Sequence, residues 1–238
     1  MHIRSISTAA AVTAALVLGS SSLAGTLTGS VKYEGREPPK RPIKMEADEG
    51  CMKKHAEPVY SETVVLNGNG TLRNVFVYVK SGVPDKPWPV PSQPVVMDQK
   101  GCQYSPHVMG VQVGQKFVVR NSDGLLHNVH SLSKVNSSFN KAMPATVTEA
   151  EYTFDKEEFM FKVKCDVHPW MGAWVTVLKH PFFAVTGDTG TFKIDGLPDG
   201  TYTVEAWHEY TQGFQPQTAQ VTIKGGATTH DFVFQGPK

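Results

Sequence analysis

The sequence predicts an all-β protein made of two sandwich domains. Short runs of alternating apolar and polar residues, rich in Val, Thr, Phe and Tyr, are separated by Gly, Pro, Asn and Asp, which is the pattern of strands joined by turns. No long amphipathic helix is evident over residues 25–82. Because a domain holds roughly 150 residues, the length of 238 residues predicts two domains.

Residues 1–24 are typical of a secretory signal peptide. Arg4 precedes an apolar run over residues 9–18, and the small residues Ser22 and Ala24 stand three and one residues before the expected cleavage point. The apolar run is shorter than the ~20 residues that a transmembrane helix needs. We therefore expect cleavage after Ala24 and a periplasmic or secreted protein with no membrane span in its mature form.

The charge of the chain is nearly balanced, with 23 basic and 22 acidic residues. Removing residues 1–24, in which Arg4 is the one charged residue, leaves 22 of each sign. Without a basic run or a charged tail, the sequence does not support nucleic acid or an anionic membrane as a partner.

The first part of the mature chain alternates strands with proline-rich loops. Residues 26–33 and 75–79 are strand-like. Residues 36–61 contain four prolines and are expected to form an extended loop that carries Cys51. Five prolines in residues 83–94 argue against a regular central strand, so this run is interpreted as a linker or domain boundary.

The central segment, residues 93–179, has the size of one small sandwich. Its expected strands are residues 108–113, 117–120, 129–132, 152–154, 159–164 and 173–178. Alternation along one of them places Phe159, Phe161, Val163 and Cys165 on a single apolar face. We therefore expect the Cys165 thiol to point into the end of the sandwich.

A soft-metal ligand set lies in the run Cys165-Asp-Val-His-Pro-Trp-Met171, which brings a thiol, an imidazole and a thioether close together. Sulfur donors favour copper(I), imidazole suits copper, and two His with one Cys and a weak axial Met form the blue-copper electron-transfer site. A second histidine must come from elsewhere. His127, in the run Asn121–His130, is the candidate.

These two segments resemble those of the cupredoxins, and most closely the amicyanin and plastocyanin branch. In that family a strand ending in Asn and Asp leads to a His-Asn-Val segment, and amicyanins carry a short Cys-x-x-His-Pro-x-Met loop, as this chain does. The resemblance implies a Greek-key cupredoxin sandwich over residues 93–179 that holds one type 1 copper. It implies His127, Cys165 and His168 as equatorial ligands, with Met171 as the weak axial ligand.

Other polar residues near the expected ligands have separate interpretations. His127 and His130 are three residues apart, so a strand sends them to opposite faces, and His130 is expected to be partly exposed. Asn128 is expected to hydrogen-bond to the ligand loop and fix a ligand's orientation. His107 is interpreted as a surface or supporting histidine. The alternative is a separate copper site that combines His107 with His55 or His130.

The three cysteines need an explanation, because an oxidising compartment favours pairs. If copper holds Cys165 as a thiolate, as the resemblance implies, Cys51 and Cys102 remain to form a disulfide. Two alternatives stay open: Cys165 is a buried free thiol, or it pairs with Cys51 or Cys102, which would abolish the metal site.

The segment after Lys179 has a different pattern. Residues 190–194 and 200–204 read Gly-Thr-Phe-Lys-Ile and Gly-Thr-Tyr-Thr-Val, and a Leu-Pro-Asp-Gly turn separates them. These motifs resemble the carboxypeptidase regulatory-like family, a transthyretin-like or prealbumin-like β-sandwich. The resemblance implies a fold and says almost nothing about function.

That family opens with a hairpin and a Val-rich strand, for which residues 29–35 and 75–79 serve here. We hypothesise that residues 25–92 plus 180–238 form one split sandwich, with the cupredoxin inserted and the disulfide joining the two domains. The simpler layout is a continuous N-terminal cupredoxin followed by a tail domain.

The expected function is transfer of single electrons by copper that cycles between Cu(I) and Cu(II), so the chain is expected to be an electron carrier and not an enzyme. The expected partner is a redox protein such as a c-type cytochrome or a periplasmic dehydrogenase. It would dock on an exposed edge of His168 rimmed by Pro169 and Trp170, since redox encounters use small interfaces. Alternatively, Trp170 packs inward against the second domain.

Three other functions remain alternatives. They are a copper carrier or storage protein, a two-site copper enzyme that uses additional histidines, and a binding module in which Trp207 or Tyr210 touches sugar or peptide. No nucleophile elbow, phosphate loop or HExxH motif in the sequence supports hydrolysis or phosphoryl transfer.

Overall fold

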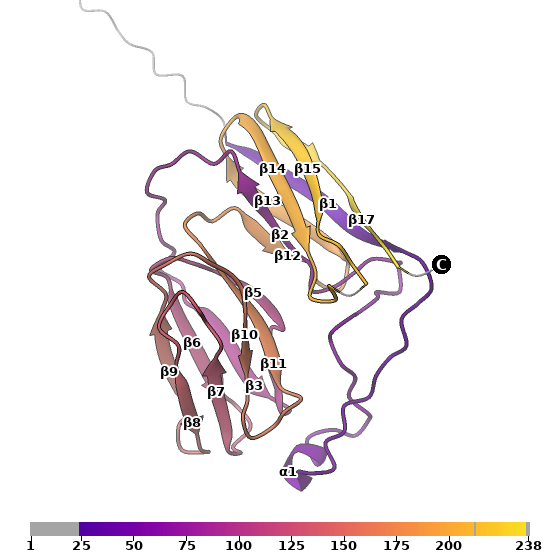
Figure 1. The fold of residues 1–238 in the computed structure, drawn as a ribbon, viewed down its shortest axis with the longest axis vertical. Coiled ribbons are helices and arrows are strands. Elements are labelled where there is room, and N and C mark those ends of the chain that lie inside the picture. The colour runs from indigo at the N-terminus through magenta and orange to yellow at the C-terminus, as the bar shows by residue number, and fades with distance from the viewer. Residues whose placement is uncertain (1–23, 212, 237–238) are drawn as a thin grey trace, which may run out of the picture.

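The chain is nearly all β. The computed structural model describes residues 24–211 and 213–236, and Figure 1 shows two layered β bodies with an extended loop beside them. The predicted signal peptide falls outside the described residues, apart from Ala24. No helix of the described part of the chain is long and apolar enough to cross a membrane.

The sheets of the first body come from the middle of the chain. Their strand orders are β5-β11-β10-β7-β8 and β4-β3-β6-β9. The strands are β3 (Val95–Lys100), β4 (Gln103–Ser105), β5 (Val108–Gln112), β6 (Lys116–Asn121), β7 (His127–Ser131), β8 (Asn140–Met143), β9 (Glu149–Thr153), β10 (Glu158–Lys164) and β11 (Gly172–Leu178). β11 pairs in parallel with β5, and β6 pairs in parallel with β3. The chain therefore crosses repeatedly between the two sheets. Their facing side chains, such as Phe117, Val129 and Val175, form one buried core.

The sheets of the second body come from both sides of this central segment. β1 (Gly25–Glu34) lies between β13 (Thr191–Leu197) and β16 (Ala227–Thr229), and it also pairs with β17 (Phe232–Gln235). The other sheet has the order β12-β2-β14-β15, with β12 (Phe183–Val185), β2 (Phe76–Ser81), β14 (Gly200–Trp207) and β15 (Gln217–Ile223). Leu27 and Val77 therefore share a core with Tyr202 and Phe234.

β10 departs from the predicted alternation at its beginning. Met160 has a φ of 48°, and the register with β11 shifts between Glu158 and Phe161. Such a bulge adds a residue and breaks the period of two. Phe159 is therefore 41% exposed, whereas Phe161 and Cys165 are buried. The prediction that Phe159 lies on the core face was wrong for this reason.

A third apolar cluster joins the two bodies. Phe76, Tyr78 and Trp207 of the second body pack with Val108 and Leu178 of the first. The bodies approach closely at Gly110, where a Cβ atom would lie 2.3 Å from the ring of Phe183.

The extended loop forms a strap, which we define as residues 42–60, closed at its base by a bridge between Pro42 and Tyr60. Its one helix is α1 (Glu49–Met52), and the Asp48 side chain caps this helix by accepting a hydrogen bond from the Cys51 N–H. Figure 1 shows the strap running alongside the first body, with α1 at its far end.

Candidate metal centre

The residues proposed as ligands come from two neighbouring strands and the loop that follows one of them. His127 is the first residue of β7, Cys165 comes directly after β10, and His168 and Met171 lie in the loop between β10 and β11. His127 is 0% exposed, and each of the other three is 2% exposed. The site is therefore enclosed by protein.

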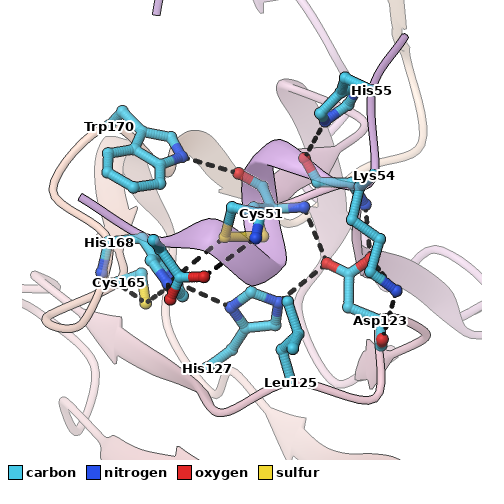
Figure 2. Close-up of a disulfide and its surroundings, with 12 residues drawn as sticks. Cys51, Lys54, His55, Asp123, Leu125, His127, Cys165, His168 and Trp170 are labelled. Carbon is cyan, nitrogen blue, oxygen red and sulfur yellow. Dashed lines mark hydrogen bonds and ion pairs between the residues drawn. A yellow bond between two sulfur atoms is a disulfide. The ribbon is translucent and has the colours of Figure 1, made fainter. Parts of the chain in front are cut away.

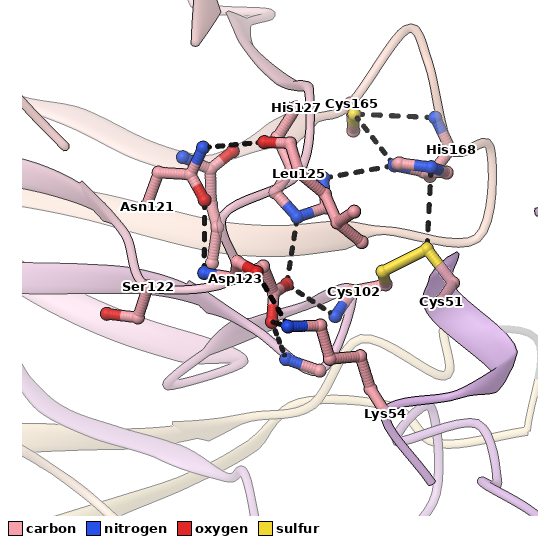
Figure 3. Close-up of polar contacts among 12 residues, drawn as sticks. Cys51, Lys54, Cys102, Asn121, Ser122, Asp123, Leu125, His127, Cys165 and His168 are labelled. Atoms are coloured by element: carbon pink, nitrogen blue, oxygen red, sulfur yellow. Dashed lines mark hydrogen bonds and ion pairs between the residues drawn. A yellow bond between two sulfur atoms is a disulfide. The ribbon is translucent and has the colours of Figure 1, made fainter. Parts of the chain in front are cut away.

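Three of these side chains converge. The ligand atoms of His127, Cys165 and His168 all lie within 4.8 Å of one another. The two Nδ1 atoms are 3.0 Å apart, and the Cys165 Sγ is 3.9 Å from the His168 Nδ1. Figure 3 shows the three side chains directed towards one another. Met171 is buried in the same core cluster. Its N–H donates to the His168 carbonyl, and its carbonyl accepts from the Cys165 N–H, so the short loop is tightly closed.

Each histidine places its other ring nitrogen against a carboxylate. The His127 Nε2 is 2.8 Å from the Asp123 Oδ2, and the His168 Nε2 is 3.0 Å from the Asp48 Oδ2. Both Nε2 atoms therefore donate, which fixes the tautomer and turns each Nδ1 towards the centre as a potential metal ligand. The hydrogen bond to His168 also lowers the pKa of Asp48.

The donor set fits a copper ion. Two Nδ1 lone pairs that face each other at 3.0 Å need a cation or a proton between them. Without metal, burial lowers the pKa of His127, but the Asp123 carboxylate and the Cys165 sulfur outweigh it and raise the pKa to about 9. Burial alone would raise the pKa of Cys165, but hydrogen bonds from His127 and the His168 N–H lower it. Copper would replace this proton and use the thiolate, as a His₂Cys site requires.

Further hydrogen bonds hold the neighbours of the ligands. The Asn128 Oδ1 accepts from the N–H of Asp166, the residue after Cys165, at 3.0 Å. Asp123 accepts from the N–H groups of Gly101 and Cys102. These bonds and the one to His127 outweigh burial, so the pKa of Asp123 is lowered, and this carboxylate stays charged beside His127.

The disulfide joins Cys51 of the strap to Cys102 in the turn after β3. Cys165 is free and buried, so neither alternative pairing of Cys165 occurs. The disulfide also lies against the site, because the Cys51 Sγ is 3.5 Å from the His168 Nε2. Figure 2 shows α1 and the disulfide beside His168 and Trp170.

The prediction that an edge of His168 is exposed was wrong. The strap covers this edge with Asp48 and Cys51, and His168 is buried. Trp170 packs against the first core and donates from its Nε1 to the Cys102 carbonyl at 3.0 Å, so it faces the disulfide and not the second body. The sequence predicted only an extended loop here and did not show that the disulfide holds it over the metal-ligand loop. The positions of His168 and Trp170 differ from the expected ones for this reason.

The other histidines lie apart from this centre. His107 forms an ion pair with Glu209, His130 is partly exposed and 2.9 Å from Asp166, and His55 contacts the Gly101 carbonyl. The remaining groups in the described residues that have metal-ligand spacing combine His168 with the disulfide cysteines, or His127 with Cys102 and Asp123. His107, His130 and His55 belong to none of them.

The sequence reasoning missed the two carboxylates. Asp123 lies four residues before His127, inside the run Asn121–His130, so its spacing offered a signal. Asp48 precedes Cys51 by three residues, which is a helix-capping pattern and gives no indication of a metal.

Comparisons with known proteins give partial similarities. No protein-family model and no curated protein matches the chain. Among solved structures, a copper-containing nitrite reductase from Thermus scotoductus is 20% identical, over 36% of this chain and 22% of that one, with a TM-score of 0.33. A purple cupredoxin from Nitrosopumilus maritimus is 25% identical, over 35% of this chain and 98% of that one, with a TM-score of 0.30.

The Cu(I) form of an amicyanin variant is 23% identical, over 42% of this chain and 97% of that one, with a TM-score of 0.33. The chain thus covers nearly all of the two small proteins and about a fifth of the reductase. These structural neighbours include cupredoxins, and the similarities span about two fifths of this chain.

Proposed function

We propose that this chain is a type 1 copper protein that carries single electrons between redox partners. The observation that carries the proposal is the convergence of two imidazole Nδ1 atoms and one thiol within 4.8 Å in a buried site. We assign Met171 as the weak axial ligand. When bound, copper supplies a one-electron couple between Cu(II) and Cu(I).

The chain's part in this function is to hold the ligands still and to exclude water. Asp123 fixes the ring of His127, and Asp48 fixes the ring of His168. The His168 N–H donates to the Cys165 sulfur at 3.4 Å, which stabilises the thiolate. Ligands held in this way change little between the two oxidation states, which favours rapid transfer.

The domain layout and location belong to the same proposal. We assign the copper domain to residues 93–179 and a second sandwich, of carboxypeptidase regulatory-like type, to residues 25–92 plus 180–238. The shared core of β1, β2 and the C-terminal strands supports the split. The disulfide supports a periplasmic or secreted location, where a c-type cytochrome or a dehydrogenase would be a suitable partner.

Spectroscopy of the mature protein loaded with Cu(II) tests the proposal. We expect an intense thiolate-to-copper band in the visible spectrum and its loss in Cys165→Ser. The corresponding electron paramagnetic resonance spectrum should lose its type 1 character in the same variant. A spectrum of ordinary copper without a thiolate band in the unmodified protein would contradict the proposal.

One observation favours a copper enzyme as the second candidate. A cavity of about 430 Å³ lies beside the ligand loop and is lined by residues that include Tyr104, His107, Trp170 and Met171. A small molecule held there would lie next to the proposed axial ligand. Addition of azide to the Cu(II) protein separates the candidates: a changed copper spectrum favours the enzyme, and an unchanged one favours the carrier.

A further inference from the structure

We infer that Asp48, a residue of the strap, positions the copper ligand His168 and lowers the reduction potential of the site; the inference rests on the proposed function. The loop that carries His168 is short, and the Nε2 side of the ring faces the strap, where the Asp48 Oδ2 and the Cys51 Sγ lie. The strap closes that side, since the Asp48 Oδ2 lies 3.0 Å from the Nε2 and the ring is 2% exposed.

The position of Asp48 is determined by the strap. Its Oδ1 accepts from the Cys51 N–H at 2.9 Å and caps α1, while its Oδ2 meets His168. Cys51 is bonded through the disulfide to Cys102. One carboxylate therefore connects the helix of the strap to the ring of a ligand, and the disulfide prevents the strap from moving away.

The same attachment reaches the other ligand histidine. The Cys102 N–H donates to the Asp123 Oδ2, the atom that also meets the His127 Nε2. The Lys54 Nζ donates to the Asp123 carbonyl. The strap, the disulfide and both carboxylates thus form one connected support for His127 and His168. Figures 2 and 3 show the part of this support that Lys54, Asp123 and the disulfide form.

A carboxylate that accepts from the Nε2–H makes the imidazole a stronger electron donor at Nδ1. A stronger donor and a nearby negative charge stabilise Cu(II) more than Cu(I), because Cu(II) carries the greater charge. Asp48 therefore favours the oxidised state. Its side chain is 36% exposed, so solvent screens part of the effect.

The test compares Asp48→Asn with Asp48→Glu and a matched control. Asn also caps helices well, so Asp48→Asn removes the charge and keeps the cap. Asp48→Glu keeps the charge but places the carboxylate on a longer side chain. The control, Glu49→Gln, makes the same charge change on the same helix, where Glu49 contacts Lys53 and is 74% exposed.

The first measurement is the reduction potential of the copper-loaded proteins, with titration of free thiols to verify that the disulfide is intact. We expect Asp48→Asn to lower the ratio of Cu(II) to Cu(I) affinity about tenfold, which raises the potential by about 59 mV for one electron. Glu49→Gln should leave the potential unchanged, and Asp48→Glu should restore part of the difference. Equal potentials in Asp48→Asn and Glu49→Gln would overturn the inference.

The second measurement needs no copper. Nitrogen NMR of the His168 ring in the metal-free protein should show the proton on Nε2, and Asp48→Asn should weaken that preference while Glu49→Gln does not. A His168 ring that is unchanged in Asp48→Asn would overturn the positioning role. Absence of a thiolate band in the unmodified protein would instead contradict the copper proposal, so the two failures are distinguishable.

Discussion

Two carboxylates hold the histidines that we propose as ligands, and they differ in burial. The Asp123 side chain is 2% exposed and accepts from His127 and two backbone N–H groups, whereas Asp48 is 36% exposed. Removing the charge of a buried carboxylate with several donors leaves those donors without their charged partner. We therefore expect Asp123 to contribute more to copper affinity than Asp48 does.

Asp123→Asn should bind copper about 10- to 100-fold more weakly, the usual cost of losing a partner of a ligand histidine. The measurement is competition for Cu(I) with a coloured chelator. Glu149→Gln is the control, since this half-exposed residue pairs with Arg120 on the same body. Equal affinities of the two variants would show that Asp123 has no role in holding His127.

Spacing along the chain indicated the candidate ligands but not their supports. Cys165, His168 and Met171 lie within one short run, and His127 is followed by an Asn and a Val in a segment that resembles one of the cupredoxins. Asp48 meets His168 across 120 residues of sequence. A contact of that kind depends on the strap and the disulfide, and no local pattern specifies it.

His208 is a buried histidine that should destabilise the protein in mild acid. Its Nδ1 accepts from the Tyr210 N–H, and its Nε2 is buried without a hydrogen-bond partner. Burial lowers the pKa of His208 from 6.5 to about 4. Between pH 6.5 and 4 the unfolded chain therefore binds a proton at His208 that the folded chain does not bind. The free energy of unfolding falls as the pH falls through this window. A pKa difference of this size corresponds to about 3 kcal/mol.

Denaturant unfolding at pH 7 and pH 4.5 measures this effect. His208→Asn retains an acceptor for the Tyr210 N–H and does not titrate, so it should lose less stability than the unmodified protein over the same interval. His180, whose pKa burial also lowers, titrates in both proteins and cancels in the comparison. An equal loss in the two proteins would rule out His208 as the source.

The elements of the fold differ in how well sequence patterns predict them. The alternating strands were expected close to where they lie, because a half-buried strand has a period of two. The bulge at Met160 was not expected, since the amino-acid sequence does not indicate which non-glycine residue adopts a positive φ. α1 is four residues long, which is too short for a helical period to be detected.

The strap is the element that encloses the metal site, and the disulfide is its anchor. The cysteines are 51 residues apart, and closing a loop of that length stabilises a fold by about 4 kcal/mol in the chain-entropy model. Replacing both Cys51 and Cys102 with Ser should therefore lower stability by up to that amount. It should also let copper leave faster, because the strap would then open more often over His168.

The measurement is the rate at which an excess of chelator removes Cu(I) from the loaded protein, at a temperature where both proteins remain folded. Reduction of the unmodified protein with a dithiol should reproduce the faster rate of the double variant. Identical rates in the oxidised, reduced and double-variant proteins would show that the strap does not control metal exchange.

At the scale of the whole molecule, an apolar cluster and a group of polar residues contribute to the contact between the two bodies. Glu209, which follows β14, forms an ion pair with His107, which directly precedes β5, and it accepts from the Trp174 Nε1 on β11 at 2.8 Å. Both side chains of the pair are 12% exposed. Burial opposes the charge of His107, and the Glu209 carboxylate outweighs it and raises the pKa of His107.

Glu209→Ala should therefore destabilise the protein by about 3 kcal/mol, because it leaves a buried His107 and the Trp174 N–H without their partner. Since these residues belong to different bodies, the lost free energy is lost at the interface. Calorimetry should then show one unfolding transition for the unmodified protein and two for Glu209→Ala. Asp188→Ala breaks an exposed pair with Arg73 within the second body, and such a pair contributes about 0–1 kcal/mol. If Glu209→Ala unfolded like Asp188→Ala, in one transition at nearly the original temperature, this polar group would not be needed to couple the unfolding of the two bodies. The apolar cluster and the disulfide would then be sufficient to couple them.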